Sequence, residues 1–186
     1  YNRLMVEGYM VKDKTNIYLD KDYADLKNIL EQYIESKRDK GTETVYTAST
    51  YLKWLQEKTR LISNESSFSI PEGVTLKRTN VVWIDFGFNI GQEFGGKHPA
   101  IILRISGEQV FVMPLSSQAP DPSDQKKPMY VKVPIVYDFP PMTRWLNVLN
   151  MKSVSMVRID FNSNIGRVSG KIMDKISESL ALCGIN

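Results

Sequence analysis

The only histidine of the chain lies in a stretch that is rich in glycine and in charged residues. His98 follows Lys97 and precedes Pro99, and Glu93 stands shortly before them in the segment FGFNIGQEFGGKHPAIIL, residues 86–103. A group that titrates near neutral pH, a cation and a carboxylate are what general acid–base chemistry on a phosphodiester requires. Glycines in the same stretch would let a ligand backbone approach closely. The segment therefore predicts a phosphodiester site; the alternative is a strand-edge histidine that only hydrogen-bonds to the backbone.

Other polar side chains stand where strands are expected to end. Ser116 and Ser117 could bond to a phosphate oxygen, although serine at a strand end is also ordinary turn chemistry. Lys152 and Arg158 could neutralise phosphates, or they could be solvated surface charges. Residue type alone makes each of them a candidate contact to an anionic ligand.

Aromatic side chains near the expected loops are candidates for stacking on unpaired bases, the usual grip on single-stranded RNA. They are Phe88, Phe94 and Trp145. Core packing is the alternative for all three, and it is favoured for Trp145. Arg144, which precedes Trp145, could meet a phosphate.

Composition narrows the classes of function. The chain has 186 residues with a net charge of +3, and residues 78–186 hold 12 Lys and Arg against 9 Asp and Glu. One cysteine, Cys183, and one histidine exclude an internal disulfide and a His/Cys zinc site, so we expect neither a metal nor a cofactor. No apolar run is long enough to span a membrane, and no secretory leader is visible, so we expect a cytoplasmic protein without a membrane partner.

Apolar spacing of three and four residues predicts two helices, 22–37 and 49–62, followed by a loop near 63–79 and later by a closing helix from about residue 169. Short segments rich in Val, Ile and aromatic residues predict strands. These are 81–86, 100–105, 110–115, 130–135, 145–150 and 153–159. The order indicates an α+β protein: an N-terminal helical hairpin, residues 1–70, and a small antiparallel barrel with a C-terminal helix, residues 71–186. The connection 116–128 is long enough to be either functional or disordered.

Four segments occur together in a characteristic order: VVWIDFGFNIGQEFGGKHPAIIL, VMPLSSQ, VLNMKSVSMVRI and the C-terminal helix. In this respect residues 78–185 resemble the MazF/PemK family of toxin endoribonucleases, whose pattern is a strand, G-x-E-x-G-x-R-P, a buried strand, a Thr/Ser-Thr/Ser-Gln strand end and a Q-[IV]-[KR]-[ST] strand. The resemblance implies an SH3-like β-barrel (MazF/PemK/CcdB-like), a homodimer, an antitoxin partner, and metal-independent cleavage of single-stranded RNA. Residues 1–70 have no counterpart in minimal members and form an extension.

The resemblance also implies roles for particular residues. Glu93 matches the Glu of the motif, Ser116 the catalytic hydroxyl residue, and His98 takes the place of the family's catalytic Arg. We expect His98, Ser116, Glu93 and Lys97 to be catalytic. The residues expected to bind RNA are Gln92, Phe94, Lys97, Ser117, Gln118, Arg144, Lys152 and Arg158.

The histidine in place of arginine leaves two functions open. Arginine would stabilise the transition state with a permanent bidentate charge, whereas histidine transfers protons far more readily, with Lys97 as a neighbouring charge. The first function is a toxin that cleaves RNA by internal 2′-hydroxyl attack. The second is a catalytically weak or silent module of the same fold that binds RNA, DNA or a target protein. The helical extension, with balanced charge, is expected to be a docking or dimer-supporting element.

Overall fold

The computed structural model of the protein describes residues 17–185. The chain divides into two compact units, one ending at Leu52 and one beginning at Lys53. The boundary predicted near residue 70 stays a prediction. Among the described residues, no helix combines the length and the apolar character that a membrane span requires.

Both predicted N-terminal helices are confirmed, and each begins earlier than its apolar spacing indicated. Helix α1 is Ile17–Arg38 and helix α2 is Thr42–Ser63, with Gly41 at a φ of +87° in the turn between them. The additional first turns carry the acidic residues Asp20 and Glu43, which suit a helix N-terminus but add nothing to an apolar pattern.

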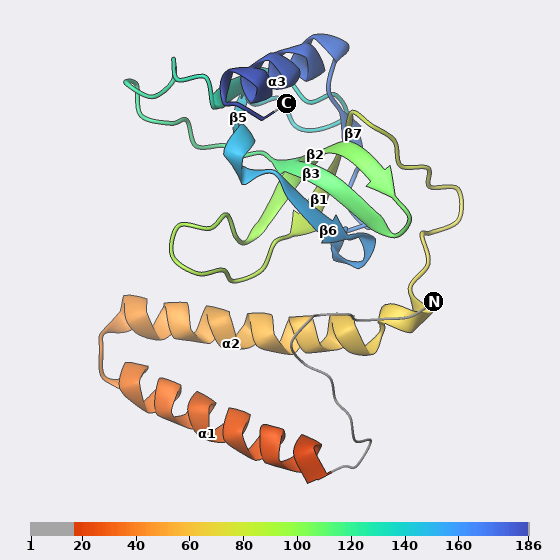
Figure 1. The fold of residues 1–186 in the computed structure, drawn as a ribbon. Helices are drawn as coiled ribbons and strands as arrows, with labels where there is room; N and C mark the ends of the chain where they lie inside the picture. The colour runs from red at the N-terminus through yellow and green to blue at the C-terminus, as the bar shows by residue number, and fades with distance from the viewer. Residues whose placement is uncertain (1–16, 186) are drawn as a thin grey trace. The chain divides into compact units, whose positions relative to one another are not determined.

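Residues 53–185 contain seven strands and the C-terminal helix α3, Gly170–Leu182 (Figure 1). The strands are β1 Asn80–Asp85, β2 Lys97–Ser106, β3 Gln109–Pro114, β4 Tyr130–Val133, β5 Arg144–Asn147, β6 Lys152–Ser155 and β7 Gly166–Arg167. Three short 3-10 helices are also present: η1 Glu65–Ser67, η2 Val148–Asn150 and η3 Met156–Arg158.

The strands form two antiparallel sheets. The larger sheet has the order β6-β3-β2-β1-β7, and β4 pairs with β5 in the smaller one. An isolated bridge from Ser116 to Trp145 joins the sheets, and a second one connects Tyr137, after β4, to Arg167 of β7. The β2–β3 register shifts between Ile102 and Arg104. The prediction of an α+β protein with a small, partly open barrel and a C-terminal helix is confirmed.

Two clusters of buried apolar side chains lie on opposite faces of the larger sheet. Val81 belongs to the first cluster, whereas its neighbour Val82 belongs to the second, as strand alternation requires. Helix α3 packs against β4 and η2, and its apolar residues Ile172, Met173 and Ile176 complete the first cluster.

Several strands are shorter than predicted. Strand β4 ends before Pro134, which has no amide hydrogen to donate to a strand partner. The segments predicted as the strands 145–150 and 153–159 each turn into a 3-10 helix after Asn147 and Ser155, whose side chains accept hydrogen bonds from amides two residues ahead. The two-residue strand β7 was not predicted.

Candidate active site and nucleic-acid interface

The loop between β1 and β2 is closed by backbone hydrogen bonds at its base. The Phe86 amide donates to the Gly96 carbonyl at 2.8 Å, and the Gly96 amide donates to the Gly87 carbonyl at 2.7 Å. Gly87 and Gly96 have φ angles of +81° and +78°, which favour glycine. A Cβ atom on Gly95 would lie 2.7 Å from the Gly87 carbonyl oxygen. The glycines are therefore needed for the loop to close.

Phe94 is the best-anchored residue of this loop. Its carbonyl accepts from Asn89 Nδ2 at 2.6 Å and from Lys152 Nζ at 2.8 Å. Its ring meets the rings of Phe86 and His98 edge-on, at centroid distances of 5.6 and 4.7 Å. The loop is thus tied both to β6, through Lys152, and to β2, through His98.

His98 is the second residue of β2 and pairs with Ile84 of β1. It is half-buried, with its ring against Phe94. A Cβ atom on Gly96 would lie 3.6 Å from His98 Nε2, so Gly96 lies beside this edge of the imidazole.

The strand register relates His98 to Ser116. The Leu115 amide donates to the Pro99 carbonyl at 2.8 Å, directly after the pair Ala100–Pro114. Beyond this bond Ser116 leaves β2 and bridges to Trp145 of β5. His98 and Ser116 therefore lie near the same end of the β2–β3 pair.

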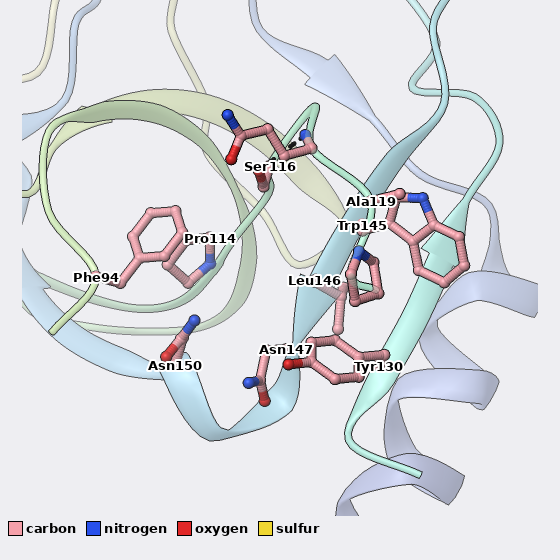
Figure 2. Close-up of a pocket in the computed structure, with 11 residues that line it drawn as sticks. Phe94, Pro114, Ser116, Ala119, Tyr130, Trp145, Leu146, Asn147 and Asn150 are labelled. Carbon is pink, nitrogen blue, oxygen red and sulfur yellow. Dashed lines mark hydrogen bonds between the residues drawn. The ribbon is translucent and has the colours of Figure 1, made fainter. Parts of the chain in front are cut away.

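Ser116 also lines a cleft of about 230 Å³ (Figure 2). Its Oγ accepts from the Gln118 amide at 3.0 Å, which fixes the chain as it leaves β3. Figure 2 shows Phe94 at one end of the cleft and Tyr130 with Trp145 at the other. The lining residues are Phe94, Pro114, Ser116, Gln118, Ala119, Pro120, Tyr130, Trp145, Leu146, Asn147 and Asn150.

Of the residues predicted to contact substrate, Phe94, Ser116 and Gln118 lie together in this cleft. Trp145, for which core packing was the favoured expectation, lines it as well. Sequence reasoning missed Tyr130, Asn147 and Asn150. Asn147 Oδ1 accepts from the Leu149 amide at 3.0 Å and so shapes the wall where β5 meets η2. The ring and the two amides are chemically suited to stacking and base-edge hydrogen bonds.

Lys97 lies apart from His98. Adjacent strand residues point to opposite faces, and Lys97 Nζ bonds to Asp160 Oδ2 at 2.6 Å. The hydrogen bonds from Lys97 and from Ser163 lower the pKa of Asp160. The charge of Lys97 is thus largely matched by a carboxylate in this structure.

Two predicted phosphate contacts, Arg144 and Arg158, do not line the cleft. Arg144 is 4% exposed, lies over the ring of Phe139 at 5.5 Å and donates to the Met142 carbonyl at 3.3 Å. Burial lowers the pKa of Arg144. The half-buried Arg158 donates to the carbonyls of Phe86 and Asp85, at 3.3 and 3.5 Å, and so holds the start of the β1–β2 loop. Both guanidinium groups thus bond to backbone carbonyls of the protein.

Three further predicted residues, Gln92, Glu93 and Ser117, are exposed, whereas Phe88 is half-buried. Gln92 and Glu93 lie at the tip of the β1–β2 loop, and Ser117 lies between two residues that line the cleft, Ser116 and Gln118. Glu93 donates its amide to the Ile90 carbonyl at 3.2 Å, which forms a turn. Among residues 17–185, no three His, Cys, Asp or Glu side chains gather in a way that could hold a metal ion.

The fold is a small, partly open antiparallel barrel with a C-terminal helix. The family model of the PemK-like, MazF-like toxin of type II toxin-antitoxin systems matches residues 77–183, so the chain belongs to this family. A comparison with curated protein sequences finds no match.

Solved structures with a similar fold include MazF from Deinococcus radiodurans, 17% identical, with a TM-score of 0.44 over 60% of this chain and 98% of that chain. A second is the MazE–MazF complex from the same organism, 16% identical, with a TM-score of 0.44 over 61% of this chain and 99% of that chain.

Proposed function

We propose that this toxin-family protein is an endoribonuclease that cleaves single-stranded RNA without a metal ion. The scissile phosphate would lie at the mouth of the cleft, between the ends of β2 and β3. The observation that carries the proposal is the placement of the single histidine, whose ring lies against Phe94, a residue that lines the same cleft as Ser116.

His98 would act by proton transfer. The ribose 2′-hydroxyl gives its proton to the imidazole as its oxygen attacks the adjacent phosphorus. The bond from phosphorus to the 5′-oxygen of the next nucleotide breaks, and that oxygen takes up a proton from solvent, while the imidazolium returns its proton to solvent. The products are a 2′,3′-cyclic phosphate and a free 5′-hydroxyl. Water is not consumed in this step, and no electrons are transferred.

Ser116 would donate a hydrogen bond to a non-bridging oxygen, since its bond from the Gln118 amide uses the acceptor capacity of the hydroxyl and not its proton. Glu93, exposed at the loop tip, would approach the scissile phosphate when RNA binds. Lys97 would contribute positive charge near the RNA backbone, and its pairing with Asp160 would weaken this contribution.

RNA binding is proposed to centre on the cleft. Phe94 would stack on a base, and Gln118 and Ser117 would bond to base edges or phosphates. Gln92 would contact RNA from the loop tip. Lys152 would act indirectly, because it donates to the Phe94 carbonyl and so positions Phe94. Arg144 and Arg158 would serve chiefly to support the strand end and the loop, because their guanidinium groups already bond to backbone carbonyls.

Membership of the toxin family supports a proposal of two protein partners, an antitoxin and a second copy of this chain. We propose that an antitoxin covers the cleft, as expected of a type II toxin, and that the active form is a homodimer. The predicted cytoplasmic location belongs to the same proposal.

The Lys97–Asp160 ion pair favours a second candidate, a catalytically silent binder. Because Lys97 is paired with Asp160, the negative charge that develops on the phosphate has weaker compensation than an arginine would provide. In that case the cleft would bind RNA, or another target, without cutting it.

Digestion of a long single-stranded RNA in EDTA decides between the two. We expect cleavage by the wild-type protein and a loss of about 10²- to 10⁴-fold in His98→Ala, the usual contribution of a positioned acid or base. Circular dichroism should show an unchanged fold. Intact RNA at stoichiometric wild-type protein would reject the ribonuclease, and full activity of His98→Ala would reject the role of the histidine.

A further inference from the structure

A second hollow, of about 300 Å³, lies between the β3–β4 connection, β4 and α3. Four lysines line it: Lys126, Lys127, Lys132 and Lys175, which we call the lysine hollow. All four are exposed. The other lining residues are Gln125, Pro128, Tyr130, Val131, Glu178, Ser179 and Leu182.

The charge of the lysine hollow remains positive after its carboxylates are counted. Lys127 bonds to Asp124 at 2.7 Å, and this hydrogen bond raises the pKa of Lys127. Glu178 adds one negative charge to the lining. Four lysines against Asp124 and Glu178 leave two positive charges, so the hollow attracts anions.

The connection that forms the hollow is ordered by its own hydrogen bonds. The amide of Gln125 donates to the Asp121 carbonyl at 3.1 Å, and its side chain donates to the Pro120 carbonyl at 3.1 Å. The buried hydroxyl of Ser179 donates to the Pro128 carbonyl and ties the end of the connection to α3. The positions of the lysine backbones are therefore defined by the fold.

The lysine hollow adjoins the cleft. The first part of the same connection, Gln118 to Pro120, lines the cleft, and its last part, Gln125 to Pro128, lines the hollow. Tyr130 lines both. Lys132 Nζ lies over the Trp145 ring at 5.9 Å, so a lysine of the hollow contacts an aromatic wall of the cleft. Bases could stack at Tyr130 and Trp145 while phosphates pass toward the lysines.

We propose that the lysine hollow binds the backbone phosphates of RNA that flank the nucleotides held in the cleft. The inference rests on the proposed ribonuclease function and extends its substrate from a short recognition sequence to a longer single strand. An acidic protein segment would also suit the charge. RNA is favoured because the hollow adjoins, through Tyr130, a cleft whose walls suit bases.

The test uses the full chain and two non-cleavable oligonucleotides, of about 5 and 15 nucleotides, with 2′-O-methyl groups throughout. Both are centred on the cleavage sequence mapped by digestion. The wild type should bind the longer one more tightly. In Lys126→Gln/Lys132→Gln/Lys175→Gln, the affinity ratio of long to short should fall toward one. For the long RNA, the magnitude of the slope of log K against log salt should be smaller by about 2 in this variant than in the wild type. Each lost phosphate contact on a single strand lowers it by about 0.7.

A matched control removes the same charge elsewhere. Lys77, Arg78 and Arg104 are exposed cations near the opposite ends of β1 and β2 from His98, and none lines the cleft or the lysine hollow. Lys77→Gln/Arg78→Gln/Arg104→Gln should keep the long-to-short ratio of the wild type.

The outcomes separate the two proposals. No cleavage by the wild type would reject the proposed ribonuclease. Cleavage with equal long-to-short ratios in the wild type and in the lysine hollow variant would overturn this inference alone. The inference would also be overturned if the lysine hollow variant kept the long-to-short ratio for RNA but lost binding to an acidic antitoxin segment. That result would make the hollow a protein-docking surface. An equal fall in the control would show only a general charge effect and would also overturn it.

Discussion

The Phe94 carbonyl is the point through which two side chains hold the β1–β2 loop against the cleft. Asn89 and Lys152 both donate to this single oxygen. We expect Asn89→Ala and Lys152→Met each to lower kcat/KM for RNA about tenfold, since a hydrogen bond contributes roughly 0.5–3 kcal/mol. Because they share an acceptor, the double variant should lose less than the product of the single losses.

Cleavage rates of the four proteins in this cycle provide the measurement, with thermal unfolding as a check that each variant is folded. Lys152→Arg keeps a donor and a charge, so it should retain more activity than Lys152→Met. Unchanged or faster cleavage in both single variants would show that the anchored loop is not the active arrangement.

The sequence predicted those residues that both have a chemically suitable side chain and belong to a motif. His98, Ser116, Phe94 and Gln118 come together at the cleft or beside it. Tyr130, Asn147 and Asn150 were missed because no motif marks them, and Tyr130 meets Asn147 only through the pairing of β4 with β5. The contacts of Arg144 could not be predicted because residue type does not reveal which face of β5 it occupies.

Strand β7 is only two residues long, yet it closes the edge of the larger sheet through Gly166. A Cβ atom on Gly166 would lie 2.6 Å from Phe139 Cδ1 and 2.7 Å from the Tyr137 carbonyl oxygen. Phe139 is buried and stacks on Trp83 at 6.2 Å. We expect Gly166→Ala to lower the free energy of unfolding by about 1–3 kcal/mol, as overpacking does.

Chemical denaturation measures this change, and Gly170 provides the control. It is the first residue of α3, and a Cβ atom there meets nothing within 4 Å. Gly170→Ala should be neutral or stabilise the protein by up to about 1 kcal/mol. Equal stability of Gly166→Ala and the wild type would contradict the close packing of β7.

Most elements could be predicted because their apolar residues repeat with a clear period. The strands β1 to β3 are confirmed within a few residues by this signal. Strand β7 has no such signal: Gly166 and Arg167 form a strand only because Val81 and Asn80 lie opposite them. The 3-10 turns after β5 and β6 arise from side-chain acceptors, Asn147 and Ser155, that ordinary strand propensity does not reflect.

Across the whole molecule, the catalytic proposal concerns only the unit that the family model matches, residues 77–183. The helical unit before it leaves large apolar side chains of α1 exposed, among them Leu19, Tyr23, Leu26 and Ile29. Such a surface fits the prediction that residues 1–70 dock a partner or support a dimer. Sequence periodicity found the helices, but it could not tell which of their apolar residues would be covered.

The central claim is that the RNA supplies its own nucleophile and that this chain supplies the base. The most direct measurement replaces the single ribose at the mapped cleavage site by 2′-deoxyribose and compares cleavage of the two strands in EDTA. The account predicts complete resistance at that position, and cyclic phosphate at the new ends of the all-ribose strand. Cleavage of the 2′-deoxy strand at the same bond would contradict it.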